Sequence, residues 1–256
     1  MTAEFAHTLE RSISIRAPRD LVFRFFTDTP RWASWWGQGS TIEGRVGGRV
    51  VIRFPGGNEV VGEVVQLNRP EQITFTYGYT SGAPIAPSAS RVTIRLEPVA
   101  EGTRVHLLHE FADAAAMQLH VQGWRYQLSL FGNVVADEAH AQSSQTVDAW
   151  FAMWSNPEAD ERRQQFDRLA APNISIRDRF SAIDGANDVR AHIDAVHTFM
   201  PGFVLRRDGS VRHCQGQLLA DWKSEGADGN ARAAGVNVFT LTGDGRIESV
   251  VGFWSA

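Results

Sequence analysis

Cysteine and lysine are almost absent from this chain of 256 residues, which contains one of each. Because Cys214 stands alone, an internal disulfide, a thiolate zinc site and an iron–sulfur cluster are all excluded. Lys223 is the only lysine, which disfavours Schiff-base chemistry. No glycine-rich nucleotide loop, GxSxG elbow or HExxH motif occurs either. We therefore expect that any catalysis uses no cofactor and no metal, and relies on carboxylate, histidine, amide and aromatic groups.

Long apolar runs and blocks of like charge are also lacking. No stretch approaches the ~20 apolar residues of a membrane span, and residues 1–10 lack the basic and apolar regions of a secretory signal. The formal net charge is −4, and no charge block indicates a nucleic-acid surface. These absences predict a cytoplasmic protein with no membrane or nucleic-acid partner. With 43% hydrophobic residues, the chain can form one large domain or two of ordinary size.

The first half has the pattern of a helix, an antiparallel sheet and a long final helix. Pro18 at the start of an apolar segment favours a helix over about 17–26. Four later segments alternate between apolar and polar residues, as strands with one buried face do; they begin near Val50, Ile73, Val92 and Val105. From about 114 to 141 the period is helical, with a stripe formed by Trp124, Leu128, Phe131 and Val135.

The polar segment 142–145 has no partner pattern, so we expect it to link a domain of residues 1–141 to a domain of residues 146–256. Thr146 is a plausible N-cap for the next helix. Helices are expected over about 147–154, 160–170 and 186–199, and three or four strands follow and end at Trp254. Residues 243–245 read Gly-Asp-Gly, a hairpin-turn sequence. Helices first and a sheet afterwards indicate a second α+β domain.

Asp178 is the most informative side chain in the second half. Residues 174–180 read as a strand, and the even positions, which point to one face, hold Ile174, Ile176, Asp178 and Phe180. A carboxylate on an apolar face pays a desolvation cost unless it is paired, and such acids are frequent at functional sites. The alternative is that Asp178 lies near the strand end, reaches solvent or caps a turn, and does no chemistry.

The first half resembles the SRPBCC (START-like, helix-grip) superfamily, and within it the family named after the activator of a heat-shock chaperone ATPase. The resemblance rests on Ala17-Pro18, on Leu21-Val22-Phe23, on Arg31-Trp32 with Trp35-Trp36-Gly37, on Gly47-Gly48-Arg49 followed by Gly62-Glu63-Val64, and on Gly123-Trp124. It implies a curved sheet around a long helix, with an apolar cavity between them that often holds a hydrophobic ligand.

The residues expected to line that first cavity follow from strand and helix parity: Tyr77, Tyr79, His109, Trp124 and Leu128. His109 is the one polar member of its strand face, and a lone histidine on an apolar face is more often a satisfied core group than a ligand contact. The cluster of Trp32, Trp35 and Trp36 can form a pocket rim, but packing is the interpretation that we favour.

The second half resembles the SnoaL-like members of the nuclear-transport-factor/ketosteroid-isomerase superfamily. The residues that carry this resemblance are the segment 176–180 with Asp184-Gly185, and Gly245-Arg246-Ile247 with Phe253-Trp254. It implies a cone-shaped α+β barrel with one apolar pocket. Asp178 matches the proton-abstracting aspartate of the isomerases. Asn237 stands where those isomerases place an acid that donates to an oxyanion, and Trp150 replaces their oxyanion-hole tyrosine, which disfavours steroid-type isomerisation.

The expected pocket walls are aromatic and apolar: Trp150, Trp154, Phe180, Trp222, Phe239, Val250 and Trp254. His213 is a further candidate, but over 212–222 the even positions, among them Cys214 and Leu218, form the apolar set. His213 is therefore expected to point outward unless Gly216 marks a bulge.

Three classes of function fit these features. The first is a cofactor-independent enzyme of the polyketide cyclase, dehydratase or isomerase type, which acts on a hydrophobic ring substrate by carboxylate acid–base catalysis with Asp178, Asn237 and His213. The second is a protein that binds a hydrophobic small molecule without turnover. The third is an interaction or stress-related module that forms a homodimer through the sheet of the second domain.

Overall fold

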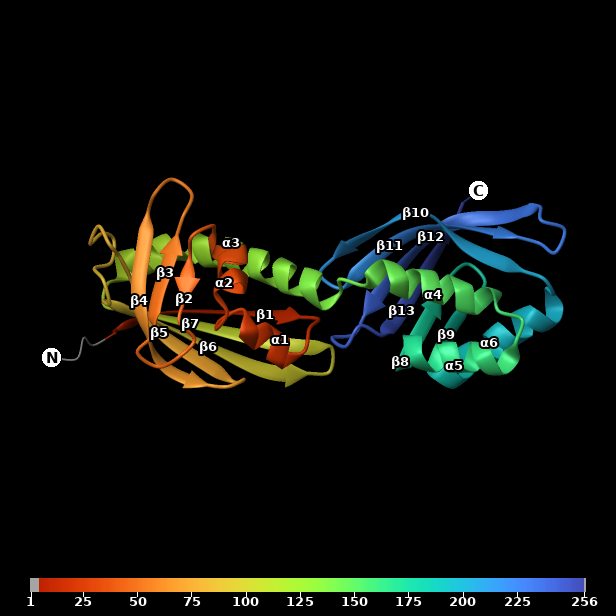
Figure 1. Cartoon of the computed structure of the whole chain (residues 1–256), viewed down its shortest axis with the longest axis horizontal. Coiled ribbons are helices and arrows are strands. Elements are labelled where there is room, and N and C mark those ends of the chain that lie inside the picture. Colours follow the sequence, from red (N-terminus) through yellow and green to blue (C-terminus); the bar gives the residue numbers. More distant parts are fainter. Residues whose placement is uncertain (1–4, 256) are drawn as a thin grey trace. The chain divides into compact units, whose positions relative to one another are not determined.

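The computed structural model describes residues 5–255, which form two α+β units, as the sequence predicts (Figure 1). The chain divides into compact units over Met1–Glu138 and Ala139–Ala256. Each contains one twisted sheet and three helices. The expected outer limits at residues 1 and 256 lie outside the described part of the chain, and the assignment of 142–145 as a linker stays a prediction.

The first unit is a seven-stranded antiparallel sheet that packs against the long helix α3 (Figure 1). The strand order is β1-β7-β6-β5-β4-β3-β2. The strands are β1 (His7–Ile15), β2 (Thr41–Ile42), β3 (Arg49–Arg53), β4 (Glu59–Asn68), β5 (Gln72–Tyr79), β6 (Ser90–Val99) and β7 (Gly102–Phe111). The helices are α1 (Arg19–Arg24), α2 (Thr29–Trp36) and α3 (Ala114–Ala139).

Helix α3 buries the stripe that the sequence predicts, since Trp124, Leu128, Phe131 and Val135 are all buried. The sequence left open whether the tryptophan cluster is a pocket rim or packing. The structure places all three tryptophans on helix α2. Asp28 caps this helix by accepting a hydrogen bond from the backbone N–H of Arg31 at 3.1 Å. No helix within residues 5–255 is both long enough and apolar enough to cross a membrane.

The second unit is a six-stranded sheet with three helices on one face (Figure 1). The strand order is β10-β11-β12-β13-β8-β9, in which only the β13–β8 pair is parallel. The helices are α4 (Ser143–Ser155), α5 (Ala159–Leu169) and α6 (Ala186–Phe199). The strands are β8 (Ala170–Arg177), β9 (Ala182–Asp184), β10 (Val204–Cys214), β11 (Gln217–Glu225), β12 (Ala231–Leu241) and β13 (Ile247–Trp254).

Element boundaries differ from expectation at two functionally relevant points. Helix α4 begins at Ser143, so Thr146 lies inside the helix and is not its N-cap. Strand β8 ends at Arg177, and Asp178 begins the tight connection to β9, in which its backbone N–H donates to the carbonyl of Ser181 at 2.9 Å. The hairpin turn expected at residues 243–245 does join β12 to β13, with the N–H of Gly245 donating to the carbonyl of Thr242.

Candidate functional site

The second domain contains a cavity of about 440 Å³ between its helices and the inner face of its sheet. Large aromatic rings dominate the lining, and several meet edge to face. The Trp222 and Trp254 rings are 5.0 Å apart, and the Phe180 ring lies 5.0 Å from Trp254. Six of the seven expected wall residues line this cavity: Trp150, Trp154, Phe180, Trp222, Val250 and Trp254. Phe180 is 70% exposed, so it lies at the mouth.

Asn237 is one of three buried polar residues in this aromatic lining, together with Ser181 and Ser224. It lies on the inner face of β12, directly opposite Ala220 on β11 and Gly252 on β13. These two small neighbours leave room around the amide: a Cβ built on Gly252 would stand 3.1 Å from Asn237 Oδ1. Asn237 is only 9% exposed, and its amide makes no hydrogen bond to any of the residues that the structure describes. Neither amide atom belongs to the fully buried polar atoms without a partner, so the amide is open to the cavity that Asn237 lines.

Asp178 lies beside Asn237 at the same point of the sheet. The Cβ of Asp178 is 3.3 Å from the position that a Gly252 Cβ would occupy, so the missing side chain at 252 lets both residues approach. Asp178 Oδ1 accepts a hydrogen bond from the backbone N–H of Phe180 at 2.7 Å, which fixes the carboxylate in the turn. Oδ2 has no hydrogen-bond or ion-pair partner within residues 5–255. Asp178 therefore both caps a turn and presents one oxygen at the cavity.

His213 and Phe239 do not line the cavity. Phe239 is fully buried in the core, where its ring packs against Trp150 and Phe151. The parity argument for His213 was wrong, because the chain reverses at Gln215 and Gly216, both at positive φ, in a two-residue turn. His213 therefore pairs with Leu218 and shares its inner face.

The position of His213 along the strand keeps it away from Asp178. It lies at the far end of β10, where its Nε2 accepts a hydrogen bond from the backbone N–H of Gly216 at 2.9 Å. Its ring packs against His140 at 5.5 Å. Cys214, which parity placed among the apolar set, is exposed for the same reason.

Sequence reasoning missed four polar residues that line the cavity: Ser181, His192, Ser224 and Arg232. His192 lies on α6 one turn before Val196, which also lines the cavity, while Val189 and Ile193 occupy the buried stripe of the same helix. Ser181 is buried and its Oγ lies 3.3 Å from His192 Nε2. The i, i+4 spacing of His192 and Val196 is the sequence signal that identifies this helix face.

The first domain contains a separate cavity of about 410 Å³ between α2, α3 and the sheet. Of the five expected lining residues, Tyr77, Tyr79 and Trp124 contact it, and Trp35 and Trp36 belong to its wall as well. The buried indole N–H groups of these two tryptophans find no acceptor within the described residues. Leu128 and His109 are core residues instead.

His109 is a satisfied core histidine, as the simpler interpretation of its sequence position held. The indole N–H of Trp124 donates to His109 Nδ1 at 2.9 Å, so the neutral ring carries its proton on Nε2, 2.9 Å from Ser90 Oγ. Ser90 in turn donates to the carbonyl of Tyr77 at 2.8 Å. Burial, and secondarily the neighbouring His120, hold the pKa of His109 well below its ordinary value.

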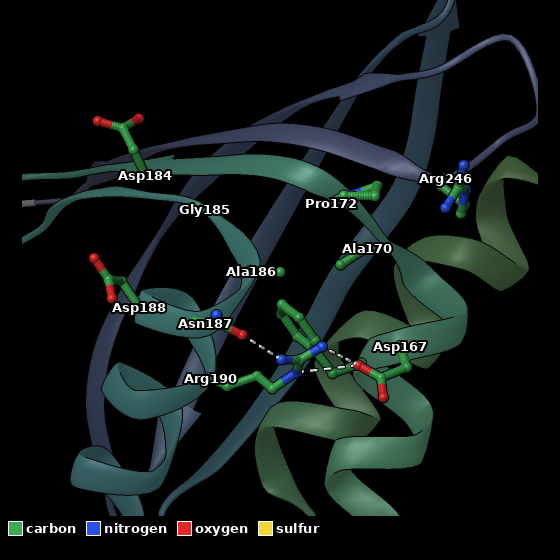
Figure 2. A pocket seen from close by; sticks show the side chains of 11 residues that line it. Asp167, Ala170, Pro172, Asp184, Gly185, Ala186, Asn187, Asp188, Arg190 and Arg246 are labelled. Carbon is green, nitrogen blue, oxygen red and sulfur yellow. Dashed lines mark hydrogen bonds and ion pairs between the residues drawn. The ribbon is translucent and has the colours of Figure 1, made fainter.

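A larger and more polar hollow, of about 640 Å³, lies at the start of α6 (Figure 2). Its central cation, Arg190, is already neutralised: the guanidinium is 2.5 Å from Asp167 Oδ1 and also donates to Asn187 Oδ1 at 2.9 Å. Arg246, at the edge of the hollow, pairs with Asp244. The cations of this hollow are thus neutralised by neighbouring carboxylates, and its lining contains few aromatic groups, so we place the candidate site in the aromatic cavity. Within residues 5–255, no cluster of three or more His, Cys, Asp or Glu side chains could hold a metal ion.

Residues 16–136 match the family model described as "Activator of Hsp90 ATPase homolog 1-like protein". This segment includes most of the sheet of the first unit and nearly all of α3, so the similarity to this family falls on the first unit. No curated protein matches the chain.

Solved structures similar to this chain each cover about half of it. A SnoaL-like family structure from Agrobacterium tumefaciens str. C58 is 25% identical, with a TM-score of 0.42, and covers 44% of this chain and 96% of its own. The Aha1 dimer from Colwellia psychrerythraea is 20% identical (TM-score 0.42; 48% and 90% covered). CalU16 from Micromonospora echinospora is 24% identical (TM-score 0.41; 54% and 80% covered). Both families expected from the sequence are thus found among the similar proteins.

We expect the stability of the first domain to fall as the pH drops below about 6.5, the ordinary pKa of histidine. The depressed pKa of His109 means that the unfolded chain binds a proton in this range and the folded chain does not. The loss is at most about 1.4 kcal/mol per pH unit for this group. Urea unfolding between pH 5 and 7.5 measures it, and His109→Gln should flatten the slope. His106→Gln, at an exposed histidine paired with Glu97, is the control; equal slopes for the wild type and His109→Gln would contradict the assignment.

Proposed function

We propose that the second domain is a cofactor-independent acid–base enzyme that acts on an apolar, ring-shaped small molecule. The observation that carries this proposal is the Asn237 amide, which makes no hydrogen bond to the described chain, is open to the aromatic cavity and lies beside the Asp178 carboxylate. A plain structural amide would be hydrogen-bonded to its own protein. The cavity volume of about 440 Å³ falls in the range typical of small-molecule sites.

The proposed role of Asp178 is that of the general base. Its Oδ2 makes no bond within the described residues, while the bond from Phe180 N–H to Oδ1 holds the carboxylate in a fixed orientation. A positioned base contributes about 10²–10⁴-fold to proton transfer. The reaction class is removal of a proton from carbon next to a carbonyl group, as in cyclisation, dehydration or isomerisation of a ring compound.

The proposed role of Asn237 is to donate a hydrogen bond to the oxyanion that forms when that proton leaves. Removing one such donor costs about 3 kcal/mol of transition-state stabilisation in well-formed sites. The rings of Trp154, Trp222 and Trp254 enclose the cavity, and exclusion of water from such a site strengthens the interaction between the amide and the developing charge. In this proposal Asp178 removes the proton, and Asn237 stabilises the negative charge that develops on oxygen.

Ligand binding without turnover is the second candidate, and the cavity of the first domain favours it. Trp35 and Trp36 have buried indole N–H groups without acceptors among the described residues, next to an apolar space of about 410 Å³. A flat apolar molecule with hydrogen-bond acceptors fits these features. The His109 network next to it is fully satisfied, so nothing in this cavity supplies a poised acid or base equivalent to Asp178.

Native mass spectrometry of the purified protein tests the two candidates together. We expect the wild type and Asp178→Asn to retain ring-containing molecules of different mass, because only the wild type converts its substrate. Asp221→Asn, at an exposed carboxylate paired with Arg212, should behave like the wild type. Gly123→Phe fills the first cavity, since a Cβ at Gly123 meets no atom within 4 Å, and should leave the difference unchanged.

Two results would contradict the enzymatic proposal. One is the absence of any retained ring-sized molecule. The other is identical retention and conversion by the wild type and Asp178→Asn. Loss of every bound molecule in Gly123→Phe alone would assign ligand binding to the first domain instead.

We also propose that two copies of this chain associate through the outer sheet face of the second domain. Leu219, Val238 and Val251 lie opposite one another on this face, and Phe253, which pairs with Val236, is 59% exposed. Apolar rows of this kind are common at interfaces between subunits.

Analytical ultracentrifugation tests the dimer. We expect a concentration-dependent dimer for the wild type and a monomer for Phe253→Glu, because a buried unpaired carboxylate opposes association. Phe199→Glu, at an 82% exposed phenylalanine on α6, is the matched control and should remain dimeric. A wild type that is monomeric at 100 μM would contradict the proposal.

A further inference from the structure

Arg179 is a cation without a carboxylate partner at the mouth of the aromatic cavity. Its guanidinium lies over the Phe180 ring, 5.0 Å from the ring centroid, and Phe180 is the exposed phenylalanine that lines the mouth. Arg179 is itself exposed, and it forms no hydrogen bond or ion pair with the described residues. Because the ring covers one face of the guanidinium, its N–H groups remain available at the edge.

The lack of a partner sets Arg179 apart from the other cations of this domain. Among the described residues of 139–255, every arginine and the lysine, except Arg168 and Arg179, forms an ion pair with an aspartate or a glutamate. Arg168 belongs to the last turn of α5 and does not line the cavity. Arg232 does line the cavity, but its guanidinium is 2.7 Å from the Asp228 carboxylate. Arg179 therefore carries a charge that another molecule can neutralise.

The order of residues along β13 fixes how far this cation is from the proposed base. Val250 is buried and lies at the inner end of the cavity. Two residues further along the strand, Gly252 stands beside Asp178. After two more residues, the Trp254 ring meets the Phe180 ring at the mouth. Because a strand rises about 3.3 Å per residue, the carboxylate and the mouth are about 7 Å apart along the strand, a span that a fused two-ring skeleton bridges.

The mouth is also the place where an anionic group of a ligand is least unfavourable. A carboxylate within the aromatic lining would lose its hydration, and the Asp178 carboxylate would repel it at close range. At the mouth the same carboxylate keeps contact with water and accepts two parallel hydrogen bonds from the guanidinium. Since Arg232 is already paired with Asp228, one guanidinium remains, and it neutralises one negative charge.

We propose that Arg179 binds a carboxylate of the substrate, and that the substrate is a ring-containing monocarboxylate whose reacting carbon lies at the end remote from that carboxylate. This inference rests on the proposed function of Asp178 and Asn237 and names the substrate class for that site.

The role of Arg179 in this proposal is binding and orientation, and not chemistry. Its guanidinium is at the mouth, on the far side of the Phe180 ring from the cavity lining, so it does not touch the reacting atoms. The ion pair with the substrate carboxylate is the same before and during proton removal. An interaction of this kind lowers KM and leaves kcat unchanged. Binding of a substrate-like probe therefore measures the contribution of Arg179 directly.

Two-dimensional NMR at pH 7 with 2-naphthoate and 2-naphthamide as probes tests this inference within the whole chain. The two probes have nearly the same shape and differ in charge, and the indole N–H signal of Trp254, next to Phe180, reports occupation of this cavity. We expect the wild type to bind 2-naphthoate about tenfold more tightly, the value of one charge-assisted contact. Arg179→Gln should abolish this preference and keep the wild-type affinity for 2-naphthamide. In the wild type the preference should shrink as the salt concentration rises, because the guanidinium is exposed.

Arg168→Gln, at the other cation without an ion-pair partner, is the matched control and should keep the wild-type preference. If the Trp254 signal responds to both probes with equal affinity, or if Arg179→Gln keeps the preference, the role of Arg179 is overturned and the proposed function stands. If 2-naphthyl phosphate, a dianion, binds more tightly than 2-naphthoate, the monocarboxylate class is wrong. If neither probe shifts the Trp254 signal at saturating concentration, the cavity is not a ring-binding site and both proposals fail.

Discussion

The close approach of three strands at Asn237 is the constraint on which the second domain depends. Ala220 and Gly252 lie on either side of the amide, and a side chain at 252 would crowd Asn237 and Asp178, with its Cβ 3.1 Å and 3.3 Å from their nearest atoms. Because residue 252 has no side chain, the sheet leaves space at this position, and Asn237 and Asp178 lie beside that space in the cavity lining. The Asn237 amide makes no hydrogen bond to the described residues and is open to the cavity, where a bound molecule can pair with it.

The two cavities differ in how their polar groups are satisfied. In the first domain, Trp124, His109 and Ser90 form a continuous chain of hydrogen bonds that ends at a backbone carbonyl. That arrangement stabilises the core and fixes the tautomer of the imidazole. In the second domain, Asn237 and one oxygen of Asp178 have no partner among the described residues. Both cavities contain buried indole N–H groups without a partner among the described residues, those of Trp35 and Trp36 in the first and of Trp154 and Trp222 in the second. The Asp178 carboxylate is what distinguishes the second cavity.

Most of the fold could be predicted from the sequence, because periodicity reports which face of a strand or helix is buried. The buried stripe on α3 follows directly from it. Parity failed for His213 because a two-residue turn at Gln215 and Gly216 reverses the chain, and odd positions then face even ones. The order of strands in a sheet is set by tertiary contacts, so the alternation within a single segment cannot predict it.

The candidate site was predicted only in part for the same reason. Asp178 was found from its residue type on an apolar face and Asn237 from the family resemblance, yet their juxtaposition depends on Gly252, which carries no side chain to signal it. His192 was missed because its partner Ser181 lies eleven residues away on another element. Phe239 was placed in the wall because an inward-facing aromatic residue looks the same in sequence whether it meets a cavity or a packed core.

The most direct test of the central claim, that Asp178 is a general base in an aromatic cavity, is hydrogen–deuterium exchange at the α-carbon of 2-tetralone. This two-ring ketone has acidic C–H bonds and no leaving group, so exchange in D₂O, followed by ¹H NMR, reports proton removal alone. The account predicts faster exchange with the wild type than in buffer, and a loss of about 10²-fold or more in Asp178→Asn. Exchange at the buffer rate with the wild type, or an undiminished rate in Asp178→Asn, would contradict it.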